Sequence, residues 1–162
     1  MARPEVAADD VDALTDAVLT ASRLLVAVSA RSIAAVEETI TLAQFRLLVV
    51  LDSRGPMKLI GLAESLAVNP SAATRMVDRL VAVGMVDRQP NPATRREVVI
   101  GLTPVGRQVV RGITERRRAE IADIVARMPE STRYGLVEAL IAFAEAGGEP
   151  PVDVPPGDPA WF

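Results

Sequence analysis

Apolar residues recur every three or four positions over most of the chain, which is the period of an amphipathic helix. This pattern predicts helices over about 9–39, 41–53, 58–67, 70–83, 103–127 and 130–146. Two short runs, 85–89 and 97–102, depart from that period and are rich in β-branched or other apolar residues. The segment between them is full of turn-forming residues, so the two runs predict a β-hairpin. We therefore expect a mainly α-helical chain with one small hairpin.

Several of these helices have recognisable ends. Thr41 and Gln44 have the spacing of a capping box, in which each side chain accepts a backbone N–H of the other residue. Two further helices begin with a capping residue followed by proline, whose missing N–H costs nothing at the first helical position; these pairs are Asn69-Pro70 and Thr103-Pro104. Gly84 is a suitable C-terminal cap for the helix over 70–83.

The same periodicity assigns faces to the central helices. The positions predicted to point inward are Leu42, Phe45, Leu48 and Val49, then Leu59, Leu62, Ala63 and Leu66, then Ala73, Met76, Val77 and Leu80, and finally Val105, Val109 and Ile113. On the helix over 70–83 the polar residues fall largely on the opposite side, and these are Ser71, Thr74, Arg75, Asp78 and Arg79. That helix is therefore expected to present a polar, arginine-bearing face.

The composition narrows the range of possible chemistry. The 162-residue chain has no cysteine and no histidine, which excludes thiol nucleophiles, disulfides, Ser-His-Asp triads and imidazole zinc sites. A carboxylate metal site or a lysine- or carboxylate-based enzyme remains open, but no spacing along the chain supplies one. We therefore predict that the protein is not an enzyme and uses no cofactor or metal. Aromatic residues are only 3%, so the core is expected to be aliphatic.

The net charge of −3 conceals an uneven distribution. Residues 1–16 and 145–162 each carry a net charge of −4, whereas residues 17–144 hold 17 basic and 12 acidic residues, a net charge of +5. A basic body between acidic ends indicates an anionic partner, with a solvated surface as the alternative. No segment approaches the roughly 18 apolar residues that a membrane span needs, and the N-terminus is acidic, so we expect no membrane association and a cytoplasmic location.

Two helices joined by a tight turn and followed by a hairpin with a basic tip are typical of a winged helix-turn-helix. A helix in the major groove presents its N-terminal residues to base edges, where Ser71, Thr74, Arg75 and Arg79 fall, and arginines such as Arg95 and Arg96 suit a minor groove. Each residue also has a structural alternative. Ser71 can serve the first turn of its helix, and Arg75 and Arg79 can be solvated surface. Arg79 can also pair with Asp78 or a neighbour, and Arg95 and Arg96 can solubilise an exposed turn.

Residues from about 40 to 110 resemble the MarR family of bacterial regulators. The segments that carry the resemblance are Thr41-x-x-Gln44-Phe45-x-x-Leu48, Leu62-Ala63-Glu64-x-Leu66, Ser71-x-x-Thr74-Arg75-x-Val77-Asp78-Arg79-Leu80, Gly84-Met85-Val86-Asp87-Arg88, Arg95-Arg96 and Leu102-Thr103-Pro104-x-Gly106. The outer helices extend the resemblance to roughly 10–145. In this family the wing usually reads Asp-Arg-Arg, and here Thr94 stands at the acidic position.

The resemblance implies a homodimer that binds a pseudo-palindromic double-stranded DNA operator and represses or activates nearby genes. We expect a repressor that is released by a small phenolic or other hydrophobic effector. The resemblance gives Ser71, Thr74, Arg75 and Arg79 the recognition role, and Arg95 and Arg96 the wing role. The expected organisation is a disordered acidic N-terminus (1–8), one domain (9–146) and a flexible, proline-rich acidic tail (147–162). Within the domain, 41–102 forms the winged part, and 9–39 and 103–146 form the dimerisation helices. The alternative is a winged ligand- or protein-binding module without DNA affinity.

Overall fold

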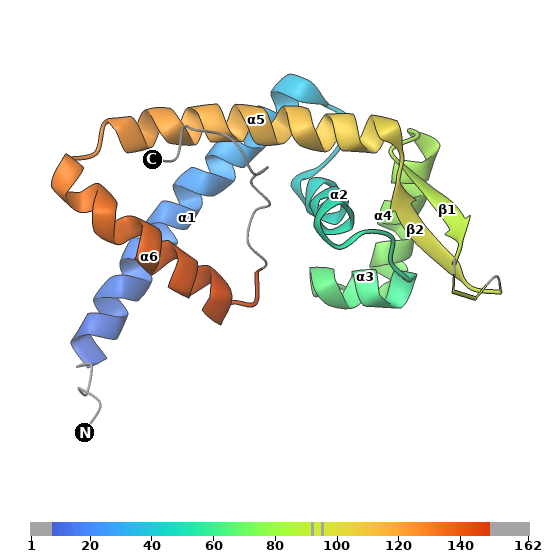
Figure 1. Ribbon diagram of the computed structural model, residues 1–162, viewed down its shortest axis with the longest axis horizontal. Helices are drawn as coiled ribbons and strands as arrows, with labels where there is room; N and C mark the ends of the chain where they lie inside the picture. Colours follow the sequence, from blue (N-terminus) through green and yellow to red (C-terminus); the bar gives the residue numbers. More distant parts are fainter. Residues whose placement is uncertain (1–7, 92, 95, 150–162) are drawn as a thin grey trace.

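The computed structural model describes residues 8–91, 93–94 and 96–149. Its elements in chain order are α1 (Ala8–Val36), α2 (Leu42–Arg54), α3 (Leu59–Leu66), α4 (Pro70–Ala82), β1 (Val86–Pro90), β2 (Val98–Leu102), α5 (Pro104–Ala126) and α6 (Glu130–Ala146). The predicted fold class is confirmed: the described chain is mainly helical with a two-stranded antiparallel hairpin. Figure 1 shows α2, α3, α4 and the hairpin at one end of the molecule, with α5 running from them towards α6.

The predicted helix starts are also confirmed. Thr41 and Gln44 form a complete capping box, in which the Thr41 N–H donates to Gln44 Oε1 (2.8 Å) and the Gln44 N–H donates to Thr41 Oγ1 (3.2 Å). The side chains of Asn69 and Thr103 accept the backbone N–H three residues along, at 2.8 and 3.1 Å. Each cap satisfies a backbone donor that the first helical turn leaves without a partner.

An aliphatic core joins the winged part to the first half of α5. Its fully buried side chains include Leu47, Leu48, Leu62, Val77, Leu80 and Ile113. Two predicted inward positions are wrong, because Leu42 is 42% exposed and Val105 is 52% exposed. Both lie in the first turn of their helix, ahead of the stretch that packs. The buried positions nearby are instead Leu47 in α2 and Val110 in α5.

A third backbone segment joins the hairpin. β1 and β2 pair antiparallel, with Val86 opposite Leu102 and Pro90 opposite Val98. On the other side of β2, Met57 exchanges two hydrogen bonds with Ile100, at 3.0 and 2.7 Å. A single residue pair has no periodicity, so the sequence pattern did not indicate this bridge. It ties the residues before α3 to the hairpin.

The start of α5 is joined closely to the turn that follows α4. Thr103 Oγ1 donates to the Gly84 carbonyl (2.6 Å), and the Thr103 N–H donates to the Met85 carbonyl (3.1 Å). Gly84 adopts a φ of +72°, a left-handed conformation that favours glycine at a helix C-terminus. Gly106 is buried against the same carbonyl, because a Cβ at Gly106 would lie only 2.0 Å from the Met85 oxygen. We call these contacts the α4–α5 joint.

The outer helices leave much apolar surface uncovered. α1 packs along α5, where Arg31 and Glu120 form an ion pair, while α6 has no buried residue. The turn between α5 and α6 is fixed by Arg133, which donates to the Ala126 and Met128 carbonyls. The exposed large apolar side chains of the two helices include Leu14, Leu19, Leu24, Leu25 and Val26 in α1 and Val137, Leu140, Ile141 and Phe143 in α6.

The apolar character of α1 exceeds what the sequence analysis expected. Residues Asp10–Val36 are long and apolar enough to cross a membrane by length and composition alone, and an 18-residue window within them has a mean hydropathy of 1.4. The earlier expectation that no segment approaches such a span is therefore wrong on that criterion, since Arg23 and Arg31 interrupt the run without making it polar overall. One such helix is weak support for a membrane protein, because helices that pack against partners have the same composition.

Candidate nucleic-acid interface

The outward face of α4 carries two arginines. Arg75 and Arg79 are exposed, whereas Ala73, Val77 and Leu80 on the opposite face are fully buried. Within the described part of the chain, neither arginine makes a side-chain hydrogen bond or ion pair to another described residue. Their guanidinium groups are therefore available for an external acceptor, and a planar guanidinium suits both a phosphate and the edge of a guanine.

The two hydroxyls at the start of α4 already have acceptors within the helix. Ser71 Oγ donates to Asn69 Oδ1 at 2.7 Å, and Thr74 Oγ1 donates to the Pro70 carbonyl at 2.8 Å. Ser71 therefore contributes to the first turn of α4, as its structural alternative supposes, and its role in DNA binding stays a prediction. Each oxygen keeps lone pairs that can accept a hydrogen bond from a ligand.

An ion pair connects α4 to the hairpin. Arg88 in β1 donates to Asp78 at 2.5 Å, and both side chains are exposed. The alternative pairing of Arg79 with Asp78 is not seen among the described residues, where the partner of Asp78 is Arg88. Arg88 was named only within a segment that carries the family resemblance, without a partner. Its spacing from Asp78 becomes meaningful only once the strand lies beside the helix.

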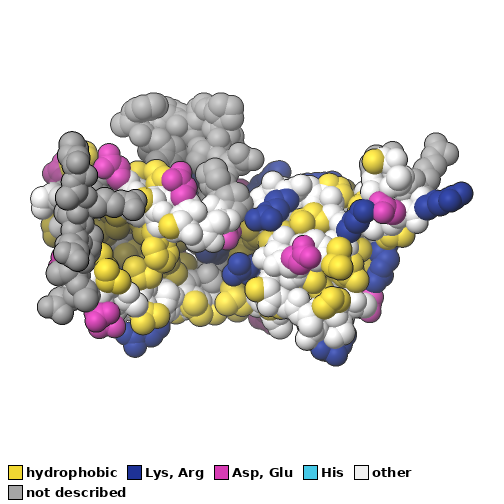
Figure 2. Space-filling model, turned by 90° about the horizontal axis from the view of Figure 1, so that it is seen from below, with side chains coloured by type: hydrophobic (Ala, Val, Ile, Leu, Met, Phe, Trp, Pro, Cys, Tyr) yellow, Lys and Arg dark blue, Asp and Glu magenta, His cyan; other side chains and the backbone are white. Residues whose placement is uncertain are grey.

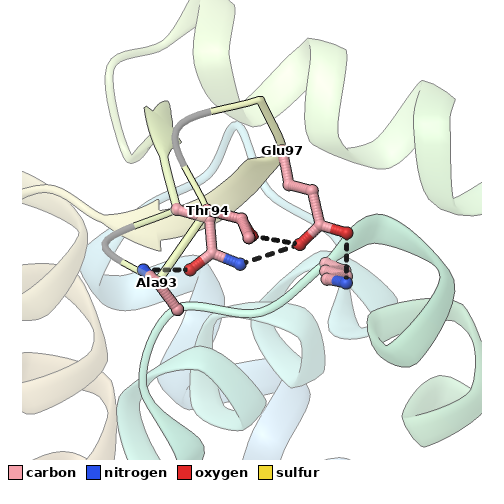
Figure 3. Close-up of polar contacts among 5 residues, drawn as sticks. Ala93, Thr94 and Glu97 are labelled. Atoms are coloured by element: carbon pink, nitrogen blue, oxygen red, sulfur yellow. Dashed lines mark hydrogen bonds and ion pairs between the residues drawn. The ribbon is translucent and has the colours of Figure 1, made fainter.

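The hairpin turn is organised by one carboxylate. Glu97 accepts from Lys58 Nζ (2.7 Å), Thr94 Oγ1 (2.8 Å) and Asn91 Nδ2 (3.0 Å). Asn91 Oδ1 in turn accepts the Ala93 N–H (3.0 Å), as Figure 3 shows. Hydrogen bonds from Lys58 and then Thr94 lower the pKa of Glu97 below its ordinary value. We call the group of Asn91, Thr94, Glu97 and Lys58 the wing clasp.

Of the two predicted wing arginines, only Arg96 lies among the residues that the structure describes. Arg96 is exposed at the end of the turn and, within the described residues, has no side-chain hydrogen bond or ion pair. Arg95 lies outside the described residues, as do the end segments 1–7 and 150–162. On the face drawn in Figure 2, most of the visible Lys and Arg side chains lie over the half of the molecule that holds the winged part, and hydrophobic side chains are visible on both halves.

A further arginine lies away from this face. The guanidinium of Arg117 in α5 lies over the Phe45 ring, 5.8 Å from its centroid. Burial lowers the pKa of Arg117, and its Nε has no hydrogen-bond partner among the described residues. The contact helps α5 pack on α2, since a cation over an aromatic face is attracted to the ring. Among the described residues, no group of three or more carboxylates lies close enough to hold a metal ion.

Comparison with known proteins places this architecture in a family. A family model described as MarR family matches residues 40–98. The multiple antibiotic resistance protein MarR of Salmonella typhimurium is 40% identical over 67 residues, 41% of this chain, and the alignment spans 46% of that protein, about half its length. The HTH-type transcriptional repressor MdtR of Bacillus subtilis is 28% identical over 68% of this chain and 71% of its own.

A solved structure extends the likeness to the outer helices. The crystal structure of RV1404 from Mycobacterium tuberculosis is 59% identical, with a TM-score of 0.82, and the match covers 88% of this chain and 97% of that one. The family model matches the central, winged part of the chain, and this structural match also includes most of the flanking helices. The chain belongs to the MarR family of winged helix-turn-helix transcriptional regulators.

Proposed function

We propose that the protein is a transcriptional regulator that binds a pseudo-palindromic operator as a homodimer, through α4 and the wing at about 90–96. The observation that carries this proposal is the outward face of α4, where Arg75 and Arg79 have no partner among the described residues while the opposite face is packed. Family membership and the gathering of basic side chains over this half of the molecule support it.

The proposed contacts follow from the position of each residue. Arg75, in the first half of α4, reads a base edge in the major groove by a bidentate contact, and Arg79 one turn later contacts a phosphate or a base. Ser71 and Thr74 take part as acceptors, because their hydroxyl hydrogens are engaged within the helix. Arg95 and Arg96 enter the adjacent minor groove, where the negative potential favours arginine.

The homodimer is proposed from the uncovered apolar faces of α1 and α6. Val137, Leu140, Ile141 and Phe143 are all more than half exposed on one short helix. Burying such side chains against a second copy removes their apolar surface from water, which stabilises the dimer by about 25 cal/mol for each Å² buried. Segments 9–39 and 103–146 are the proposed dimerisation elements, and 41–102 the DNA-binding part. A two-fold axis would place the recognition helices about 34–36 Å apart, one helical turn of DNA.

The proposed regulation is repression that a small molecule releases. A repressor role agrees with the name of the Bacillus subtilis relative. Release by a small phenolic or other hydrophobic effector rests on the family resemblance, and a cytoplasmic location follows from the need to reach the chromosome. If the effector favours one of two dimer conformations, it changes the spacing of the recognition helices and hence DNA affinity.

Fluorescence anisotropy with labelled duplexes from the region upstream of the protein's own gene tests the DNA-binding proposal. We expect saturable binding that weakens as the salt concentration rises. The logarithm of the binding constant should fall with the logarithm of the salt concentration, with a slope of about −0.9 for each phosphate neutralised. Arg75→Ala should weaken specific binding. The control Arg127→Ala, at the end of α5 that is far from α4, should not. Absence of salt-dependent binding to any upstream duplex would favour the alternative, a winged module without DNA affinity.

The homodimer is tested separately by sedimentation velocity. We expect the protein to sediment as a dimer at micromolar concentration. A stable monomer at that concentration would overturn the dimer proposal and, with it, the pseudo-palindromic operator.

A further inference from the structure

The wing clasp connects two elements that are far apart in the sequence. Lys58 is the residue before α3, and Glu97 closes the turn before β2. One Glu97 oxygen, Oε1, accepts from Lys58, while the other, Oε2, accepts from Asn91 and Thr94. The Met57–Ile100 bridge lies directly beside it. The wing turn is therefore held against the helix-turn-helix at two neighbouring points.

Backbone hydrogen bonds show that the turn itself is closed around Glu97. The Asn91 N–H donates to the Glu97 carbonyl (2.8 Å), and the Glu97 N–H donates to the Thr94 carbonyl (2.9 Å). The Glu97 side chain then reaches back to Asn91 and Thr94, so backbone and side chain fix the same turn. Arg96 is adjacent to Glu97 in the chain, and its position depends on this turn.

We propose that Glu97 is a positioning residue for DNA binding, which holds the wing turn against the start of α3 so that Arg96 is presented to the DNA in one place. This inference rests on the proposed DNA-binding function and adds a role for a residue that carries the wrong charge for a DNA contact. Thr94, which stands where the family usually has an acidic residue, is itself held by Glu97.

The charge of Glu97 makes the proposal sharply testable. A carboxylate on a DNA-facing wing repels phosphates, so simple electrostatics predicts that Glu97→Gln tightens DNA binding. The clasp predicts the opposite. An amide has one acceptor oxygen and an NH2 group that only donates, so a glutamine cannot accept from Lys58 on one side and from Asn91 and Thr94 on the other. The wing turn then loses some of the hydrogen bonds that hold it in one conformation. DNA binding has to order the turn, and this cost lowers the affinity.

The first experiment measures operator affinity by anisotropy for the full-length wild type, Glu97→Gln and a matched control, Glu64→Gln. Glu64 is an exposed carboxylate on α3, so its replacement removes the same charge from the winged part. We expect Glu97→Gln to weaken binding about 2- to 12-fold, the range for ordering one side chain on binding. We expect Glu64→Gln to leave affinity unchanged or tighten it slightly.

Lys58 supplies the rescue test. It is the only lysine in the chain. Lys58→Met should weaken binding as Glu97→Gln does, while Lys58→Arg, which keeps the charge and a donor, should retain most of the affinity. The double variant Lys58→Met/Glu97→Gln should lose no more than about the larger single loss, because both changes break one interaction. Fully additive losses would show that Lys58 acts as an independent phosphate contact.

A spectroscopic readout separates positioning from a general loss of fold. The chain has no cysteine, so Ala93→Cys provides one site for a spin label at the exposed wing tip. In the free protein, Glu97→Gln should increase label mobility while the thermal unfolding midpoint changes little. If the wild type binds DNA and Glu97→Gln binds as tightly or more tightly with unchanged mobility, the inference is overturned. If the wild type binds no DNA, the proposed function fails first.

Discussion

Replacing Gly106 by alanine tests the α4–α5 joint. The added Cβ would lie 2.0 Å from the Met85 carbonyl oxygen and 3.0 Å from Leu102 Cδ2. The oxygen belongs to the backbone and accepts a hydrogen bond from Thr103, so it cannot rotate away as a side chain would. The start of α5 must therefore move away from the turn that follows α4.

The expected loss combines three contributions. Overpacking of a tight site costs about 1–3 kcal/mol. A weakened Thr103–Met85 hydrogen bond costs about 1 kcal/mol more. Alanine favours a helix over glycine by about 1 kcal/mol, which offsets part of the loss. We therefore expect Gly106→Ala to lower the free energy of unfolding by about 1–3 kcal/mol.

Urea denaturation followed by circular dichroism measures this free energy, at one fixed protein concentration because the proposed dimerisation would affect it. Gly61→Ala in α3 is the matched control. A Cβ at Gly61 would meet only the flexible end of Met57, at an ordinary 3.6 Å, so this variant should be more stable by about 0.5–1 kcal/mol. Gly106→Ala equal to or more stable than the wild type, with Gly61→Ala behaving as expected, would refute the reasoning.

Three further outcomes are expected. Arg75→Ala should cost about 1–3 kcal/mol of operator binding and relax sequence preference, measured by anisotropy on cognate and mismatched duplexes; equal affinity on both would argue against base readout. Leu140→Glu on the exposed face of α6 should shift sedimentation from dimer to monomer without loss of helical circular dichroism. Because the pKa of Glu97 is lowered in the folded protein, the stabilisation from its clasp should be complete above the ordinary carboxyl pKa of about 4.3 and be lost only as the pH falls below it. Spin-label mobility at Ala93→Cys should therefore stay constant from pH 8 to 5, and a rise in mobility within that range would contradict it.

Local signals in the sequence were sufficient for the fold. The capping box at Thr41, the Asn69-Pro70 start and the change of period after Gly84 each act within four residues, so they could be recognised without knowledge of tertiary contacts. The inward positions were right where the helix packs along most of its length, as with Ala73, Val77 and Leu80. The predicted inward positions were wrong at Leu42 and Val105, which lie in the first turn of their helices, ahead of the stretch that packs.

The candidate site was only partly predictable, because its polar contacts join distant segments. Arg75 and Arg79 were found from their face of one helix. The Lys58–Glu97 and Asp78–Arg88 pairs span 39 and 10 residues, and nothing in the periodicity indicates them. The engagement of the Ser71 hydroxyl by Asn69 also depends on a rotamer that the sequence does not specify.

The length of α5 has a mechanical consequence. Its 23 residues extend about 35 Å at 1.5 Å per residue, from the α4–α5 joint to the turn before α6 (Figure 1). A tilt of about 5° at the α6 end displaces the joined end by about 3 Å, nearly one base-pair rise of 3.4 Å. Because the joint is fixed by hydrogen bonds and by the close contact at Gly106, α4 follows that displacement. In the proposed homodimer, a small rotation between the subunits would therefore displace α4 relative to the DNA grooves while the winged part keeps its internal structure.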